Sequence, residues 1–153
     1  MRRFVTIAMM LILGFAGAVT ISCEQSPTVP SEIGTVDQLV QSLRGEGLTV
    51  STNGEISPSN NGFFTVPAQE LLVDGEHVDG FEYSTAERAA AEAALISSDA
   101  QPNPYTRITW VSVPRFYRQG RLIALYVGCS SKILAALGKS LGAPIVTGPT
   151  PCR

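Results

Sequence analysis

The six residues 122–127 (LIALYV) constrain the fold most, because none of them is charged and almost all are strongly apolar. Side chains alternate between the two faces of a sheet, so a strand that is apolar at every position must be covered on both faces. We therefore expect residues 122–127 to form a central strand of a sheet.

Further strands are predicted from short apolar runs bounded by Gly, Pro and Asn. A hairpin is expected where the runs ELLV and VDGFEY flank DGEH. The segment PRFYRQG is expected to turn between the strands RITWVSV and RLIALYV, and LTVST and FFTV predict two shorter strands. Short connections of this kind join antiparallel neighbours.

Three helices are predicted. The first spans residues 36–44, where apolar residues recur at helical spacing behind a capping box formed by Thr35 and Gln38. The second starts at Ser84 and continues through an alanine-rich body with high helix propensity. The third spans residues 131–141 and ends at a Gly followed closely by a Pro.

Together these elements predict an α+β fold. We expect an antiparallel sheet of four to six strands, with three helices packed mainly on one face. Residues 36–153 are enough for one core and too few for two, so they are expected to form a single domain.

Residues 1–22 have the pattern of an export signal, with two arginines before an uncharged run. The residues TISC, which end at Cys23, resemble a bacterial lipobox, in which a signal peptidase cuts before a cysteine that carries diacylglycerol. The residue three before that cysteine is usually Leu and here is Thr20. The resemblance implies a lipoprotein-type signal peptide over residues 1–22 and lipidation of Cys23. Cleavage after Ala18 and an uncleaved helical anchor stay open as alternatives.

Residues 23–35 are expected to be a flexible tether behind the lipidated cysteine, because they are polar, contain two prolines and lack apolar periodicity. About 12 flexible residues reach only about 20 Å. Two acyl chains hold a protein on a bilayer, whereas one binds only marginally. The expected location is the bacterial cell membrane, with the domain anchored by its N-terminal lipid and facing the extracytoplasmic side.

Two further cysteines, Cys129 and Cys152, suggest a disulfide, since an exported domain with an even number of remaining cysteines commonly forms one. The predicted helix between them is short enough for the C-terminal tail to run back along it. The alternative is two unrelated thiols, one buried and one on a loose tail.

The charges are divided along the chain. All 13 acidic residues lie between Glu24 and Asp99, whereas residues 100–153 carry seven basic residues and no acidic one. Either the two halves neutralise each other, or one face of the domain is basic. Nucleic acid is not expected as a partner, because the exported chain is acidic overall.

The predicted turn PRFYRQG carries the candidate binding surface. Its residues Arg115, Phe116, Tyr117 and Arg118, with Arg121 just after it, would suit an anionic membrane surface or an anionic envelope polymer if the turn is exposed. The alternative is that the aromatic pair closes the end of the sheet as a small hydrophobic plug.

No catalytic or metal site is predicted, and no cofactor. His77, the only histidine, lies among acidic residues at a hairpin tip, but neighbouring strand residues point to opposite faces. The segment GKSLG matches G-x-S-x-G, but Ser140 is expected within a helix and not on a strand-to-helix turn.

Residues 110–128 (WVSVPRFYRQGRLIALYVG), with VDQLVQSLRGEGLTV and FEYSTAERAAAEAALIS, resemble a family of uncharacterised bacterial exported proteins. The likeness covers most of residues 36–141. It implies the domain boundaries and brings no activity. Cys129 and Cys152 are not part of the family pattern.

The leading hypothesis is a lipid-anchored extracytoplasmic domain that binds or scaffolds an envelope protein or polymer without catalysis. A second is an envelope hydrolase that uses carboxylates such as Glu70 and Glu82, which would require both acids in one cleft. A third is an inhibitor or accessory subunit of an envelope complex, which would show an exposed apolar patch.

Overall fold

The computed structural model describes residues 33–152. The expected signal peptide, the lipidation site Cys23 and most of the expected tether therefore lie outside the described residues. Spatial contacts group Ser31–Arg153 into one unit, and the description below concerns that unit alone.

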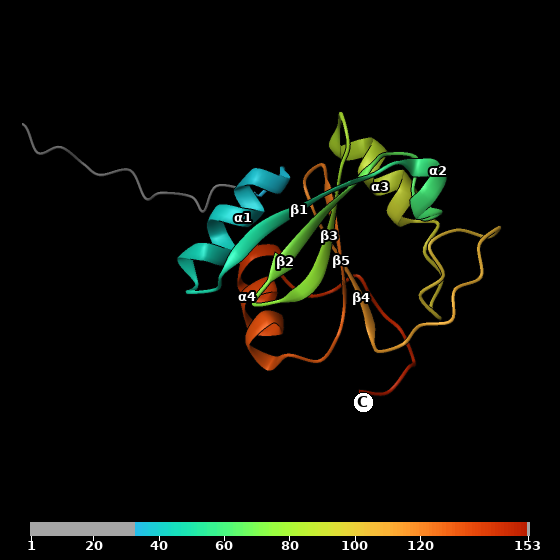
Figure 1. Cartoon of the computed structure of the whole chain (residues 1–153). Helices are drawn as coiled ribbons and strands as arrows, with labels where there is room; N and C mark the ends of the chain where they lie inside the picture. The colour runs from blue at the N-terminus through green and yellow to red at the C-terminus, as the bar shows by residue number, and fades with distance from the viewer. Residues whose placement is uncertain (1–32, 153) are drawn as a thin grey trace, which may run out of the picture. The chain divides into compact units, whose positions relative to one another are not determined.

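A six-stranded antiparallel sheet organises the domain, which confirms the predicted α+β class (Figure 1). The strand order is β1-β2-β3-β5-β4-β6, and every neighbouring pair is antiparallel. The strands are β1 (Val50–Ile56), β2 (Ala68–Val73), β3 (Glu76–Glu82), β4 (Pro114–Gln119), β5 (Leu122–Val127) and β6 (Val146–Thr147).

Strand β5 occupies the centre of the sheet, between β3 and β4, and five of its six residues are buried. Alternate β5 side chains enter two separate apolar clusters. Leu122, Ala124 and Tyr126 belong to one cluster, and Ile123 and Leu125 belong to the other. The expectation of a strand covered on both faces is confirmed.

Two helices cover the face of the sheet toward which Tyr126 points. They are α1 (Val36–Gly45) and α4 (Ser131–Leu141), whose buried residues join that apolar cluster. Gly80 of β3 allows α1 to lie close, because a Cβ there would be only 2.8 Å from Val36 Cγ2. The predicted capping box at Thr35 is present.

The opposite face is covered by α3 (Ala86–Ala93) and by long loops (Figure 1). The helices therefore occupy both faces, and two of the three longer helices share one face. Helix α3 begins after Thr85, whose hydroxyl accepts from Arg88 N, one residue later than predicted. A fourth, single-turn helix, α2 (Pro58–Asn61), follows β1.

Two predicted strands are wrong. The FFTV segment is a loop whose Phe63 and Phe64 rings pack edge-on against Phe81, with centroids 6.3 and 4.7 Å away. The RITWVSV segment has no strand, because the outer edge of β4 is already paired with β6. Trp110 instead donates its indole N–H to Ala100 O at 3.1 Å.

Candidate functional site

The predicted basic surface is not assembled as expected, because the PRFYRQG segment is strand β4 and not an exposed connection. Phe116 is fully buried and Tyr117 is 2 % exposed, each in a different apolar cluster. They therefore do not form an exposed aromatic pair, and they pack in the core on opposite faces of the sheet.

The three arginines of the predicted surface are also separated. Arg115 donates to Gly128 O at 2.6 Å, and Arg121 pairs with Glu82 at 2.7 Å. Arg115 and Arg118 are three positions apart on one strand, so they point to opposite faces. Arg118 makes no ion pair within residues 33–152. A single cationic tip is therefore not formed.

The two oppositely charged halves of the chain meet at the surface. Four ion pairs each join a base from the second half to an acid from the first: Arg107 to Asp99, Arg121 to Glu82, Lys132 to Asp74, and Lys139 to Glu46. These pairs favour mutual neutralisation over a basic face. Exposed pairs of this kind contribute about 0–1 kcal/mol each to stability.

The carboxylates proposed for a hydrolase do not converge. Glu82 points to the α1 face, where it accepts from Val36 N at 3.1 Å and pairs with Arg121. Glu70 is paired in register with Asp79, three residues before Glu82, so Glu70 points to the other face. Glu70 and Glu82 therefore do not lie in one cleft, as the hydrolase hypothesis requires of this pair.

A different acidic pair lies on the α3 face. Glu70 and Asp79 are opposite each other on β2 and β3, and His77 Nδ1 is 2.8 Å from Glu70 Oε1. Burial and, to a lesser degree, the Glu70 charge raise the pKa of the Asp79 carboxyl to about 6, with His77 acting in the opposite direction. Within residues 33–152 no cluster of His, Cys, Asp and Glu has the arrangement of a metal site.

Ser140 has a structural role. Its hydroxyl is 2.7 Å from that of Ser42, so the two serines join α4 to α1. Ser140 lies in the last turn of α4, as expected, and not on the strand-to-helix turn that a nucleophilic serine requires.

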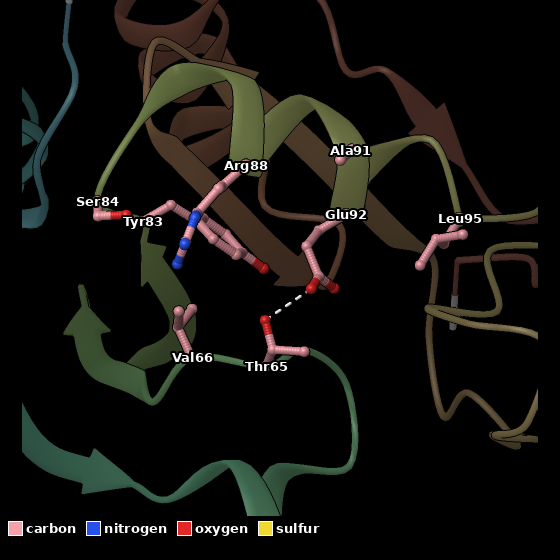
Figure 2. Close-up of a pocket in the computed structure, with 8 residues that line it drawn as sticks. All are labelled: Thr65, Val66, Tyr83, Ser84, Arg88, Ala91, Glu92 and Leu95. Carbon is pink, nitrogen blue, oxygen red and sulfur yellow. Dashed lines mark hydrogen bonds between the residues drawn. The ribbon is translucent and has the colours of Figure 1, made fainter.

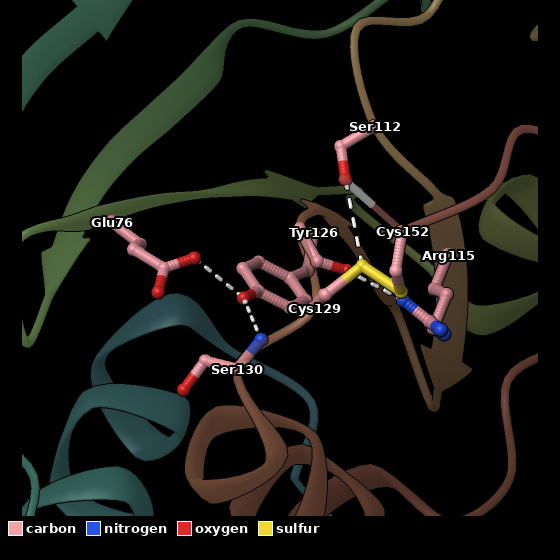
Figure 3. Close-up of a disulfide and its surroundings, with 8 residues drawn as sticks. Glu76, Ser112, Arg115, Tyr126, Cys129, Ser130 and Cys152 are labelled. Atoms are coloured by element: carbon pink, nitrogen blue, oxygen red, sulfur yellow. Dashed lines mark hydrogen bonds between the residues drawn. A yellow bond between two sulfur atoms is a disulfide. The ribbon is translucent and has the colours of Figure 1, made fainter.

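The predicted pairing of Cys129 with Cys152 is confirmed, with an S–S distance of 2.01 Å (Figure 3). Close by, the Tyr126 hydroxyl donates to Glu76 Oε2 at 2.6 Å and accepts from Ser130 N at 3.0 Å. Burial and the Glu76 hydrogen bond raise the pKa of Tyr126 to about 12. This network and the disulfide fasten the start of α4 and the C-terminal tail to the sheet.

A cavity of about 690 Å³ beside α3 is the strongest candidate for a binding site (Figure 2). Binding pockets for small molecules commonly have about 300–1,000 Å³. Three segments build it: the loop before β2, the end of β3, and one side of α3. Its lining consists of Thr65, Val66, Tyr83, Ser84, Arg88, Ala91, Glu92 and Leu95.

Tyr83 is the unusual member of this lining. The residue is only 2 % exposed, and its hydroxyl has no hydrogen-bond partner in the described part of the chain. Burial raises the pKa of Tyr83, and the nearby Glu92 charge raises it further. A buried polar atom without a partner costs about 1–3 kcal/mol, so a native protein that keeps one warrants a specific explanation.

Arg88 and Glu92 are four residues apart on α3, a spacing at which opposite charges can pair. They make no ion pair with each other. Glu92 instead accepts from Thr65 Oγ1 at 2.6 Å. In Figure 2 the Tyr83 hydroxyl lies between the Arg88 guanidinium and the Glu92 carboxylate.

A second cavity of about 530 Å³ adjoins the first, and the two share Thr65, Glu92 and Leu95. Its outer wall includes Tyr105, which is 95 % exposed. The α3 side of the domain therefore offers two neighbouring hollows.

The sequence analysis missed Tyr83, Arg88 and Glu92 as site residues. The Arg88–Glu92 spacing is common on helix surfaces, and Tyr83 ends a strand like many core tyrosines. Only the packing of the loop containing Thr65 brings these three residues around one cavity.

Within the described part of the chain, no helix has both the length and the apolar character needed to cross a bilayer. Compared with family models, curated proteins and solved structures, the chain has no match. What the protein does is therefore inferred from its own pocket, disulfide and charge pairs.

Proposed function

We propose that the protein is a non-catalytic binding domain of the bacterial cell envelope, held at the membrane by a lipid on Cys23 and facing the extracytoplasmic side. The observation that carries the binding role is the cavity beside α3, in which the buried Tyr83 hydroxyl has no hydrogen-bond partner and Arg88 makes no ion pair within the described residues. The Cys129–Cys152 disulfide supports the extracytoplasmic location, because disulfides persist in oxidising compartments.

Binding is favoured over catalysis by the composition of the lining. An activated hydroxyl needs a base in hydrogen-bond reach that is itself oriented by a third group. Thr65 contacts Glu92, but the lining residues include no His, Lys or Cys. His77 is on the sheet, in contact with Glu70, and does not line this cavity.

The binding role is tested by thermal unfolding of the full-length protein in mild detergent, with and without a panel of amino acids, dipeptides, neutral sugars and phosphate. A ligand at 100 times its Kd stabilises a protein by about 2.7 kcal/mol. Ala91→Phe fills the cavity and is expected to abolish the shift. Ala90→Phe is the matched control, because Ala90 is exposed on the same helix and does not line the cavity.

The proposed binding site is rejected if no compound raises the unfolding temperature, or if both phenylalanine variants respond like the native protein. Anchoring is tested separately: Cys23→Ala should abolish acyl labelling and leave an unprocessed precursor. Unchanged labelling of that variant would reject the lipid anchor and leave the binding result unaffected.

An accessory subunit is the second candidate. Leu95 and Tyr105 are exposed apolar side chains that line the second cavity. A photo-reactive residue at Tyr105 should then cross-link one envelope protein, and a probe at Lys139, on α4, should not. Equal cross-linking at both positions would reject this candidate.

A further inference from the structure

The ligand class can be inferred from the charges around the first cavity, an inference that rests on the proposed binding function. Three polar groups are concentrated there: the Arg88 guanidinium, the Tyr83 hydroxyl and the Glu92 carboxylate (Figure 2). One is a cation that donates hydrogen bonds, one is a neutral hydroxyl that can donate, and one is an anion that accepts.

The lack of an ion pair between Arg88 and Glu92 bears on which charges a ligand carries. Direct pairing would satisfy both charges with each other, whereas here they make no ion pair. The Tyr83 hydroxyl, which lies between them in Figure 2, has no partner within residues 33–152. Glu92 Oε1 accepts from Thr65 Oγ1, which leaves Glu92 Oε2 as an acceptor and the Arg88 and Tyr83 donors for groups of a ligand.

A simple anion would be attracted by Arg88 but repelled by Glu92, and a simple cation would face the reverse. A molecule with both charges a few ångströms apart satisfies both sites and can accept a hydrogen bond from Tyr83. Arginine binds carboxylates with two parallel hydrogen bonds, and a carboxylate accepts from an ammonium group. Val66, Ala91 and Leu95 supply apolar surface for a side chain.

We propose that this cavity binds a small zwitterion, a free amino acid or a short peptide, with its carboxylate on Arg88 and Tyr83 and its ammonium group on Glu92. The neutral apolar lining favours ligands with an aliphatic side chain. A free amino acid and a dipeptide present the same two charges at different separations, so both are included as probes.

The experiment is calorimetric titration of the full-length protein with alanyl-leucine, free leucine, N-acetyl-alanyl-leucine and alanyl-leucine amide. The acetylated probe lacks the ammonium group and the amide probe lacks the carboxylate. Each loss is expected to weaken binding by about tenfold or more, since a hydrogen bond to a charged group contributes about 1.5–3 kcal/mol and 1.4 kcal/mol is tenfold.

Variants assign each charge to its residue. In Arg88→Gln the dipeptide and its amide should bind equally, and in Glu92→Gln the dipeptide and its acetylated form should bind equally. Tyr83→Phe should weaken binding of the three carboxylate probes without lowering stability, because the hydroxyl makes no hydrogen bond within the described residues. Arg107→Gln and Glu55→Gln are matched controls outside the cavity and should bind like the native protein.

The outcomes separate this inference from the proposed function. If sugars or phosphate bind and Ala91→Phe abolishes it, while the zwitterions do not bind, the binding function stands and the ligand class is wrong. If the blocked probes bind as tightly as alanyl-leucine, the two-charge model is wrong. If no probe of any class binds, both proposals fail.

Discussion

Loss of the Cys129–Cys152 disulfide is expected to destabilise the domain by about 3 kcal/mol. The bridge joins Cys129, two residues beyond the end of β5, to the C-terminal tail, across a sequence separation of 23. In the chain-entropy model, closing a loop of about that size restricts the unfolded chain by about 3 kcal/mol. Because the free energy of unfolding of such a domain is typically about 5–15 kcal/mol, the effect is a large share of the total.

The folded state itself should change little when the bridge is removed. Between Cys129 and Cys152 the tail is held independently, since Ile145 N donates to Phe116 O at 2.8 Å and Gly148 N donates to Pro114 O at 2.9 Å. Loss of the bridge should therefore free only the residues after Gly148 from the rest of the domain. The destabilisation should therefore arise from a more expanded unfolded state, which also predicts a steeper dependence of the unfolding free energy on urea.

The measurement is urea unfolding of the native protein and of a Cys129→Ser, Cys152→Ser double variant, each with and without dithiothreitol. Dithiothreitol should lower the urea concentration at the unfolding midpoint of the native protein to that of the double variant. It should leave the midpoint of the double variant unchanged. A difference below about 1 kcal/mol, or a variant whose urea dependence is shallower than that of the native protein, would refute the entropic reasoning.

Three further substitutions test the packing and the electrostatics by the same unfolding assay. Gly80→Ala should cost about 1–3 kcal/mol, because its Cβ would lie 2.8 Å from an α1 methyl carbon, whereas Gly138→Ala in α4, where a Cβ meets open space, should stabilise by about 0.5–1 kcal/mol. Equal effects of the two glycine changes would contradict the close approach of α1. Tyr126→Phe should cost about 1–3 kcal/mol by leaving the Ser130 N–H without its acceptor; a neutral result would mean that water replaces the hydroxyl. The pKa of Asp79 is raised on folding to about 6, so the native protein should lose stability relative to Asp79→Asn as pH rises from about 4 to 7, by about 1–3 kcal/mol after allowance for partial exposure. A pH-independent difference between the two proteins would exclude that shift.

The elements predicted correctly were those specified by local signals. Strand β5 is apolar at every position, and the β2–β3 hairpin turns at Asp74 and Gly75, which both have positive φ, as an Asp-Gly turn requires. The first helix carries its own capping box. None of these features depends on a distant partner, so one sequence suffices to recognise them.

The two wrong strands depended on distant partners. The segment RITWVSV has strand-like alternation, but β6 already occupies the only free edge beside β4. Phe63 and Phe64 have strand propensity, yet their rings close the core from a loop. The pocket could not be predicted from the sequence either. Within the described residues the Tyr83 hydroxyl has no hydrogen-bond partner, and this depends on tertiary packing and not on the spacing of residues along the chain.

The insertion of β5 between β3 and β4 has a consequence for how the protein is made. Synthesis begins at the N-terminus, so β1, β2 and β3 are complete well before β5, the second strand that pairs with β3, exists. Until residue 122 emerges, β3 has one unpaired edge, and the apolar side chains that pack against β5 lack that partner, which favours aggregation. A chain interrupted before that point lacks the central strand of its sheet, and no strand made earlier can take its place.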